Sequence, residues 1–450
     1  MKEFISCEDL QNFSAAFDLD PRSQVAMDAV VENGIIASAR NSAAAAKYLH
    51  AYSVNVESGD VCNQKQSGRC WMFASLNVFR LEVMKKLNLK NMELSQSYPL
   101  FWDKLEKSNY FLENILDTLD EPLDGRVVAY LLTDPVGDGG QWDMFRSLVA
   151  KYGVVPKDVY PESNVSSSTR ELKKYLTTKL REFACTLRTA HEAGKGMDEL
   201  RAMKDQMMET VYRMLTICLG KPPVKFTWET KDKDEKFIRI ADITPQEFYE
   251  QYVGFDLDEY VTVINAPTKD KPYGKTFTVQ CLGSVRGGKY PVKYLNLPIE
   301  ELKRLTIDQL KNGEVVWFGS DVGQFSDRAK GILATDSLKL EQLFSTLFPL
   351  TKEQRLNYGE SLMTHAMVIT GVNLVTDENG NETPNRWRVE NSWGDEHGDK
   401  GYFTMSDEWF SEFVYQILLN RKYFTAEESA QFDAEPIELK PWDPMGSLAF

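Results

Sequence analysis

The sequence predicts an α+β fold, with helices in the first half of the chain and strands mixed with helices in the second. Before residue 224, apolar residues recur at spacings of three and four, the pattern of helices with one buried face. After residue 224, short apolar runs such as Val261–Ile264 and Val315–Phe318 are typical of strands. A chain of 450 residues exceeds one compact core, so we expect two or three domains, or one domain with large inserts.

The composition argues against several classes of protein. Hydrophobic residues make up 42% of the chain and charged residues 26%, as in ordinary globular proteins. The net charge of −15 makes attraction to nucleic acid or to an anionic membrane unfavourable. No apolar stretch approaches the roughly 18 residues of a membrane-spanning helix, and Met1–Ser6 opens no signal sequence. We therefore expect a cytoplasmic protein without membrane or nucleic-acid partners.

The cysteines are scattered and show no paired spacing. They are Cys7, Cys62, Cys70, Cys185, Cys218 and Cys281. The sequence contains no Cys-x-x-Cys and no His-x-x-x-His that would indicate a metal site. We predict neither a disulfide framework nor a metal or cofactor.

Cys70 is the strongest candidate for a chemical role. It ends the turn-rich stretch Asn63–Arg69 and begins an apolar run with helical spacing that extends to Leu87. At a helix N-terminus, unpaired N–H groups and the helix dipole favour a thiolate, which is the nucleophilic form. A lone intracellular cysteine is more often a packed core residue, so the interpretation depends on partners elsewhere in the chain.

Three further features precede residue 224. Residues 1–56 are predicted to form a polar helical arm. The adjacent glycines Gly139 and Gly140 stand before a helix and permit close approach of another backbone, as the wall of a peptide-binding site requires. Apolar residues at helical spacing from Leu172 to Cys218, interrupted by Gly194 and Gly196, predict an αα-hairpin with one apolar stripe.

Two strands in the last third carry candidate partners for Cys70. His365–Thr370 and Trp387–Asn391 flank the turn-rich Asp377–Asn381, which predicts an antiparallel hairpin. A hairpin centred on residue 378 would place His365 directly opposite Asn391, with Cβ atoms roughly 4.5–5.5 Å apart. The imidazole could then take the thiol proton while the asparagine orients it. His397 competes for the base role, but it lies in a turn without a comparable orienting residue.

These motifs together resemble those of the papain-like cysteine peptidases, and in particular the bleomycin hydrolase and aminopeptidase C family. The resemblance rests on three ordered segments: Asn63–Gln64 to Cys70–Trp71, Thr364–His365–Ala366, and Glu390–Asn391–Ser392–Trp393–Gly394. It implies a two-lobed papain-like core with a large helical insert and with extensions at both termini. It covers nearly the whole chain.

The resemblance also implies roles for residues outside the Cys–His–Asn set. Gln64 matches the glutamine whose side-chain amide helps to stabilise the oxyanion. Trp393 matches the indole that shields the His–Asn hydrogen bond from water. Gly139 and Gly140 match the strip that binds the substrate backbone.

Two departures from ordinary papain are informative. Ser67 occupies the position where secreted papains carry a disulfide cysteine, which is consistent with a reducing compartment. His365 follows Cys70 by 295 residues, against roughly 130–150 in papain and the cathepsins. The αα-hairpin lies within the resulting insert. In bleomycin hydrolase such an insert is the hook of a ring of six subunits, so the resemblance implies a homohexamer; we expect the apolar stripe, including Leu176 and Met207, to pack against a neighbouring subunit.

The C-terminal segment Lys440–Phe450 resembles the terminal arm of the same family. That arm lies in the cleft, where its final carboxylate binds the free amine of the substrate. Relatives commonly expose an alanine after losing a last residue, so either Ala449 or Phe450 could be the functional terminus. An unpatterned tail is otherwise more often a frayed end.

The predicted organisation has five parts: an arm (1–56), the helical lobe with the nucleophile (57–161), the hairpin insert (162–223), the rest of the insert with the β lobe (224–430), and the C-terminal arm (431–450). The predicted function is that of a cytoplasmic cysteine aminopeptidase acting on peptides with a free N-terminus, with bleomycin-like amides as further substrates. An acyltransferase with a Cys–His–Asp triad and a ring scaffold or nucleic-acid binder with a vestigial cleft are the alternatives. Asn391 and Gln64 favour the peptidase.

Overall fold

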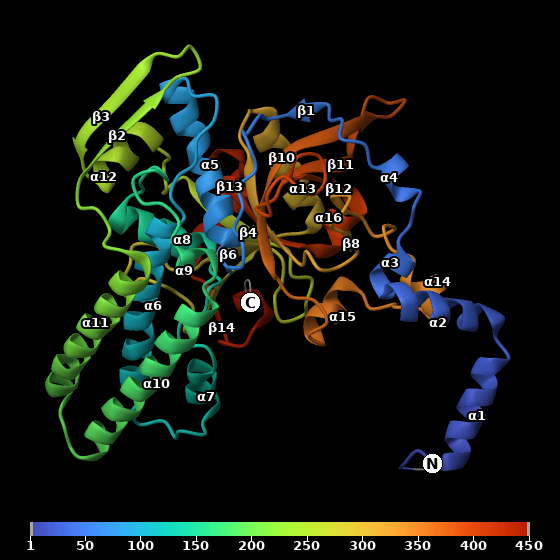
Figure 1. The fold of residues 1–450 in the computed structure, drawn as a ribbon, viewed down its shortest axis with the longest axis horizontal. Helices are drawn as coiled ribbons and strands as arrows, with labels where there is room; N and C mark the ends of the chain where they lie inside the picture. The colour runs from blue at the N-terminus through green and yellow to red at the C-terminus, as the bar shows by residue number, and fades with distance from the viewer. Residues whose placement is uncertain (1–2, 448–450) are drawn as a thin grey trace.

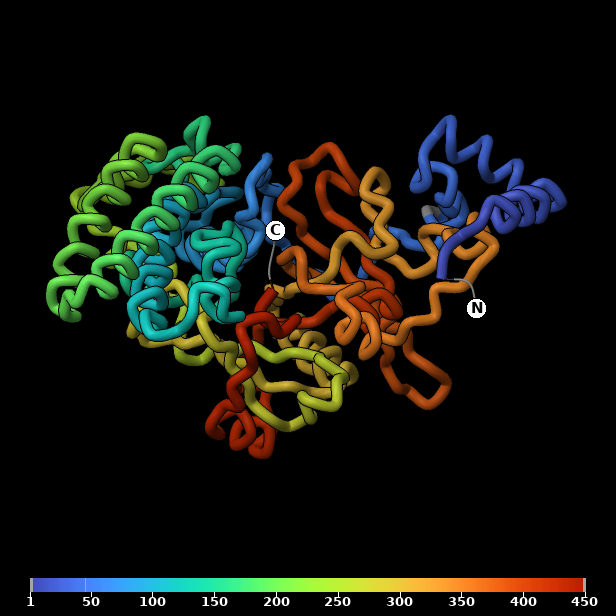
Figure 2. Tube along the Cα trace, turned by 90° about the horizontal axis from the view of Figure 1, so that it is seen from below, coloured from blue at the N-terminus to red at the C-terminus, as the bar shows by residue number. Residues whose placement is uncertain are grey.

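The computed structural model describes residues 3–447 and divides into a helical side and a sheet side (Figure 1). In Figure 1 the long helices gather on the left and most of the strands on the right. Figure 2 shows the same division from below, with the segment that follows β13 rising between the two sides toward the C-terminus. The N-terminal helices, in blue, extend to one end of the molecule, whereas the segment that follows β13 lies near its centre.

The first half of the chain is almost entirely helical, as its periodicity predicts. Its helices are α1 (Cys7–Asp18), α2 (Pro21–Asn33), α3 (Ile35–Ala39), α4 (Ala44–Lys47), α5 (Cys70–Leu87), α6 (Ser97–Asp117), α7 (Arg126–Thr133), α8 (Trp142–Tyr152), α9 (Asn164–Ser167), α10 (Arg170–Glu192) and α11 (Met197–Leu219). The second half adds α12 (Pro245–Phe248) with a following π-helical turn (Tyr249–Val253), α13 (Ile299–Lys311), α14 (Leu340–Phe344), α15 (Lys352–Asn357), α16 (Asp407–Phe413) and α17 (Ala426–Asp433).

The strands of the second half form one large mixed sheet and one small one. They are β2 (Phe226–Lys231), β3 (Phe237–Ile243), β4 (Tyr260–Ile264), β5 (Lys275–Val279), β6 (Tyr294–Asn296), β7 (Val316–Ser320), β8 (Ser326–Asp327), β9 (Ile332–Leu333), β10 (His365–Thr376), β11 (Glu382–Glu390), β12 (Tyr402–Ser406), β13 (Val414–Asn420) and β14 (Ile437–Leu439), with β1 (Val54–Asn55) from the first half. The large sheet has the order β14-β5-β6-β4-β13-β7-β10-β11-β12-β9-β8, β1 pairs with β10, and β2 pairs with β3 separately.

The large sheet separates two hydrophobic clusters. Successive residues of a strand point to opposite faces, and on β10 Val368 packs in the cluster that contains α5, α6, α8 and the hairpin helices. Its neighbours Met367 and Ile369 pack in the second cluster, with α13 and α16. The helical side and the sheet thus share one core, in which Phe79 of α5 and Trp317 of β7 are both fully buried.

A buried ion pair also connects the two sides. Arg80 of α5 donates to Glu390 at the end of β11 over 2.6 Å, and both side chains are fully buried. Asn77, one turn earlier on α5, donates to the same carboxylate oxygen over 2.7 Å. Burial raises the pKa of Glu390 and the Arg80 charge acts against this rise. Because Asn391 follows Glu390, the pair ties the helix that begins at Cys70 to the strand that leads into Asn391.

The predicted αα-hairpin is present, but its apolar stripe is not available to another subunit. Leu176 is fully buried and Met207 is 8% exposed, because both helices pack within the cluster that contains α6 and α8. The expectation that these two residues contact a neighbouring subunit is therefore wrong. The periodicity correctly identified the buried face of the hairpin. It did not show that this face packs within its own subunit.

The β10–β11 hairpin is present with a register different from the expected one. The ladder pairs Val368 with Glu390 and Thr376 with Glu382, so its turn is centred on residue 379 instead of 378. Extending this register places Asn391 opposite Met367, and His365 lies diagonally from it. A shift of two residues keeps side chains on the same face of a sheet, so the two side chains can still meet.

Within residues 3–447, no helix has both the length and the apolar character needed to cross a membrane. The six cysteines all fall in this range and are free thiols.

Candidate active site

Cys70 is the first residue of α5, and its side chain is 1% exposed. The helix begins there because the Arg69 carbonyl accepts the N–H groups of Met72 and Phe73 at 2.9 and 3.0 Å. No side chain caps this N-terminus. Burial raises the pKa of the Cys70 thiol to about 11, and the backbone N–H groups of Ala366, Trp71 and Cys70 itself oppose that rise. Because Ala366 follows His365, this contact also brings the start of β10 against the thiol.

His365 and Asn391 are joined by a hydrogen bond that defines the histidine tautomer. His365 Nε2 lies 2.9 Å from Asn391 Oδ1, and both side chains are buried. The Ser392 backbone N–H donates to the same Oδ1 over 2.7 Å. Since a backbone N–H can only donate, that atom is an acceptor, and Nε2 must carry the proton in the neutral imidazole. Nδ1 is then the basic nitrogen, free to accept a proton.

The surroundings of His365 favour its neutral form. Burial lowers its pKa to about 4; the hydrogen bond to Asn391 acts in the opposite direction, and the charge of Arg328 lowers the pKa further. The Trp393 ring lies 4.9 Å from the imidazole ring, centroid to centroid, and the Arg328 guanidinium lies 4.4 Å from the centroid of Trp393. Arg328 precedes β9 and has no sequence pattern that connects it with a histidine 37 residues later, so sequence reasoning missed it.

Gln64 is held against the segment that carries Asn391. Its backbone N–H donates to the Ser392 carbonyl over 2.8 Å, and its Oε1 accepts from the Ser392 hydroxyl over 2.5 Å. Its Nε2 donates to the Ser67 carbonyl over 2.7 Å. Because a carbonyl can only accept, this contact defines which end of the amide is the nitrogen. One N–H of the Gln64 amide remains for another acceptor.

Gly140 is required for a reason that the sequence did not reveal. A Cβ atom at this position would lie 2.6 Å from the indole of Trp71, the residue after Cys70. The same indole donates its N–H to the Asp138 carbonyl over 2.8 Å. The segment that contains Gly139 and Gly140 therefore packs directly on the start of α5, beside the nucleophile candidate.

A buried cluster of charges supports this glycine segment from α6. Lys104 donates to the Gly137 carbonyl over 2.7 Å, and Lys107 donates to the Gly139 carbonyl over 2.5 Å. Asp138 lies 2.8 Å from Lys104, and Asp103 lies 3.1 Å from Lys107. Charged residues are seldom fully buried unless they are paired. In the sequence, Asp103 and Lys107 show only a spacing of four residues, which is ordinary on a solvated helix.

Burial and mutual attraction act differently on the members of this cluster. Burial lowers the pKa of Lys107 to about 8. Burial would raise the pKa of Asp138, but the ammonium group of Lys104 outweighs it and the pKa is lowered. Asp103 has a raised pKa because burial dominates there. Burial would also lower the pKa of Lys104, the donor to the Gly137 carbonyl, but Asp138 and Asp103 outweigh it and the pKa is raised. Lys107, the donor to the Gly139 carbonyl, therefore loses its charge more readily than Lys104.

The C-terminal segment runs along a cavity of about 590 Å³ beside the glycine segment. Gly139, Tyr130 and Trp442 are among the residues that line it. Met445 is buried, and its carbonyl accepts from the Tyr294 hydroxyl at 3.1 Å and from Gln141 Nε2 at 3.3 Å. Ala449 and Phe450, the candidates for a functional terminus, lie outside the described residues.

The structure thus brings Cys70, His365, Asn391, Gln64, Trp393, Gly139 and Gly140 into one region. His397 is half-buried in the turn between β11 and β12, where its carbonyl accepts the Gly401 N–H. A buried cysteine at a helix N-terminus, beside an asparagine-oriented histidine, is the arrangement of a thiol-dependent acyl-transfer site.

Comparison with known proteins agrees with this class of site. A model of the Peptidase C1-like family matches residues 4–446. Aminopeptidase C of Lactobacillus delbrueckii subsp. lactis is 47% identical over 453 residues, which cover 100% of both chains. Bleomycin hydrolase of Homo sapiens is 45% identical over 409 residues, covering 90% of this chain and 89% of that protein. The crystal structure of PepW from Lactobacillus rhamnosis HN001 matches with a TM-score of 0.96 at 49% identity, over 100% of each chain.

The fold and the matches define a papain-like cysteine peptidase. The chain belongs to the Peptidase C1-like family, within the group of aminopeptidase C and bleomycin hydrolase, and it is a cysteine-type aminopeptidase. The predicted α+β fold with a papain-like core is confirmed.

The lowered pKa of His365 predicts the acid side of the pH profile. If neutral His365 takes the thiol proton, kcat/KM is full at neutral pH and falls as the pH drops through about 4, well below the 6.5 of a free imidazole. Arg328→Gln removes a charge that disfavours the imidazolium, so this limb should move to higher pH. The measurement is kcat/KM against pH for both proteins, with activity recovered at pH 7 to exclude unfolding.

Arg386→Gln is the control, because this half-buried arginine of the same sheet is not among the groups that shift the pKa of His365. A limb that moves to lower pH in Arg328→Gln, or moves equally in the control, contradicts this account of the His365 pKa.

Proposed function

We propose that this protein is a cytoplasmic cysteine aminopeptidase in which Cys70, His365 and Asn391 form the catalytic triad. The observation that carries the proposal is the hydrogen bond from His365 Nε2 to Asn391 Oδ1. It leaves Nδ1 of His365 as the base, at the start of the strand whose Ala366 N–H contacts Cys70. An asparagine cannot take a proton, so its role is to orient the imidazole.

The proposed reaction proceeds through an acyl-enzyme. His365 Nδ1 takes the Cys70 proton as the sulfur forms a bond to the carbonyl carbon of the substrate. The imidazolium then gives the proton to the leaving amine as the C–N bond breaks. Water, deprotonated by the same imidazole, then attacks the thioester. The C–S bond breaks, the amino acid is released, and the imidazolium returns its proton to the Cys70 sulfur. Starting from a neutral thiol and a neutral imidazole, the charges develop during the reaction and are neutralised at its end.

Gln64 is proposed to stabilise the negatively charged oxygen formed in both steps. Its remaining amide N–H and the backbone N–H of Cys70 would be the two donors. Ser67 and Ser392 hold the amide with a defined orientation, and donors held in place before the reaction are the ones that lower its barrier.

Gly139, Gly140 and Trp393 complete the proposed substrate-binding region. Gly139 and Gly140 would bind the substrate backbone, and the buried charges of Lys104 and Lys107 keep this segment in place. Trp393 lies against His365, and there it would exclude water from the hydrogen bond to Asn391. The substrates proposed are peptides with a free N-terminus, and also bleomycin-like amides, since the human relative is named bleomycin hydrolase.

The C-terminal arm is proposed to impose the exopeptidase specificity. The arm is anchored at Met445 beside the cavity that adjoins the glycine segment. Five residues follow Met445. A carboxylate at Phe450, or at Ala449 after removal of Phe450, would pair with the α-ammonium group of the substrate and block longer chains.

The subunits are proposed to assemble into a homohexamer, with part of the contact made by the N-terminal arm. Leu10, Phe13 and Phe17 lie at spacings of three and four on α1, and they are 57%, 62% and 39% exposed. An apolar stripe with no cover within the described chain marks a surface for another molecule. The arm therefore takes over the role that the sequence had suggested for the hairpin stripe.

Cys70→Ala is expected to lower turnover of an aminoacyl fluorogenic amide by at least about 10³-fold, because it removes the nucleophile. Iodoacetamide should inactivate the wild type by alkylating Cys70. Cys185→Ala is the matched control, since this thiol is exposed on α10. Residual turnover above about a tenth of the wild type in Cys70→Ala, short of the loss for a missing nucleophile, would show that Cys70 is not the nucleophile.

Removal of residues 445–450 is expected to convert the enzyme into an endopeptidase. The truncated protein should lose its preference for a free N-terminal amine and gain cleavage of N-acetylated peptides, because the carboxylate is gone while Cys70 and His365 are intact. The measurement compares free and N-acetylated forms of one peptide amide. A variant that lacks only Phe450 should keep its aminopeptidase activity if Ala449 is the working terminus. An unchanged preference in the longer truncation would assign the selectivity to another part of the site.

Aspartate at both Leu10 and Phe13 is expected to lower the sedimentation coefficient, because charge on the stripe disfavours its burial in an interface. Aspartate at Gln11 and Ser14, exposed positions of the same helix, is the control and should leave the assembly intact. Both proteins should keep the wild-type far-ultraviolet circular dichroism spectrum, since α1 buries no residue in its own subunit. A wild-type protein that sediments as a monomer would contradict the proposed assembly.

A further inference from the structure

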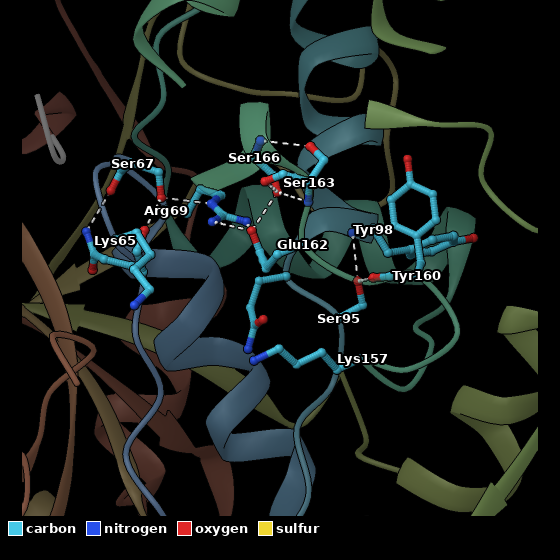
Figure 3. A network of polar contacts seen from close by, with 12 residues as sticks. Lys65, Ser67, Arg69, Ser95, Tyr98, Lys157, Tyr160, Glu162, Ser163 and Ser166 are labelled. Carbon is cyan, nitrogen blue, oxygen red and sulfur yellow. Dashed lines mark hydrogen bonds and ion pairs between the residues drawn. The ribbon is translucent and has the colours of Figure 1, made fainter. Parts of the chain in front are cut away.

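Arg69, the residue before Cys70, is fully buried at the junction of two segments (Figure 3). Its guanidinium forms a fork with Glu162, with Nη1 and Nη2 at 2.8 and 2.9 Å from the two carboxylate oxygens. Its Nε donates to the Ser67 hydroxyl over 2.8 Å. Three nitrogens of one rigid group are thus occupied, which defines the position of Ser67 relative to Glu162.

Ser67 transmits this position to Gln64 through two contacts. Its hydroxyl, which accepts from Arg69, donates to the Gln64 carbonyl over 2.7 Å. Its own carbonyl accepts the Gln64 side-chain amide over 2.7 Å. The chain of contacts runs from Glu162 through Arg69 and Ser67 to the amide nitrogen of Gln64.

Glu162 belongs to the entrance of the hairpin insert. It precedes α9, and the Ser166 hydroxyl of that helix donates to its carboxylate over 2.6 Å. Burial would raise the pKa of Glu162, but Arg69 and Ser166 outweigh it and the pKa is lowered, which keeps the carboxylate charged. The Gln66 N–H also donates to the Ser167 carbonyl over 3.0 Å. The entrance of the insert therefore forms hydrogen bonds with the loop from Gln64 to Arg69 at two points, Gln66 and Arg69.

We infer that Arg69, held by Glu162, is a positioning residue that aims the Gln64 amide at the developing oxyanion, so that the insert entrance contributes to transition-state stabilisation. The inference rests on the proposed role of Gln64. Oxyanion donors act only when they are placed at the position of the transition-state oxygen. A displacement of about 1 Å can cost 10²-fold in rate. Loss of the contacts that hold this amide should therefore lower kcat measurably.

A purely structural role is the alternative, and it predicts a different result. Arg69 also lies over the Phe73 ring, 5.1 Å from its centroid, and its loss could loosen the start of α5 as a whole. Such a change would reduce the reactivity of Cys70 and would act equally whether or not Gln64 is present.

The experiment is a double-mutant cycle on kcat for an aminoacyl fluorogenic amide, with Arg69→Lys, Glu162→Gln and Gln64→Ala. Lysine keeps the positive charge but cannot form the pair of parallel hydrogen bonds to the Glu162 carboxylate. Gln64→Ala should lower kcat by about 10²–10³, and Arg69→Lys by about tenfold or more with KM little changed. In the Gln64→Ala background, Arg69→Lys should have almost no further effect.

Two further measurements separate positioning from folding. The rate of Cys70 alkylation by iodoacetamide should be unchanged in Arg69→Lys, because alkylation forms no oxyanion. Ser67→Ala removes only the hydroxyl in the middle of the chain, and it should reproduce the loss of kcat if Arg69→Lys fails to fold. Lys157→Gln is the control, since Lys157, labelled in Figure 3, forms an ion pair with Glu93 at 2.7 Å that leads to neither Ser67 nor Gln64.

The outcomes are distinct. Equal losses of kcat for Arg69→Lys with and without Gln64 would overturn the inference, and so would alkylation that slows in parallel with kcat. A normal kcat in Gln64→Ala would overturn the oxyanion role itself, and the inference with it. Loss of kcat in Gln64→Ala with none in Arg69→Lys or Ser67→Ala would overturn the inference alone.

Discussion

The buried ion pair between Arg80 and Glu390 is the interaction on which the site depends. It joins α5, which starts at Cys70, to the end of β11, which leads into Asn391. Two charges removed from water are tolerated only when each compensates the other, and removing one partner typically costs about 3–5 kcal/mol. The helix and the strand can therefore not shift along each other without leaving a buried charge unpaired. This constraint acts on the relative placement of Cys70, the proposed nucleophile, and the histidine–asparagine pair.

Much of this architecture can be predicted from local sequence patterns. Helical spacing correctly placed the start of α5 at Cys70, and turn residues correctly placed the β10–β11 hairpin. The register was wrong by two residues because the hairpin centre was chosen to make His365 and Asn391 opposite. The predicted turn Asp377–Asn381 is itself centred on residue 379, which is the observed centre. The hydrogen bond forms nevertheless, since diagonal side chains on one face remain within reach.

Other features could not be predicted because sequence patterns describe a single element and not its partner. The stripe with Leu176 showed that the hairpin has a buried face, but not that α6 packs against it. Lys104 and Lys107 look like residues of a solvated helix until the glycine segment is seen to run over them. Arg69 and Glu162 are separated by 93 residues, and only the folded insert brings them together.

The single hydrophobic cluster shared by the helical side and the sheet has a consequence for the energetics of turnover. This cluster includes Cys70, Trp317, Ala366 and Val368. The two sides therefore cannot separate without exposing a continuous apolar core to water. Cys70 and His365, the proposed nucleophile and base, are consequently held in place before any substrate arrives. Little of the binding energy of a peptide is then consumed in assembling the site, and it remains for lowering the barrier to chemistry.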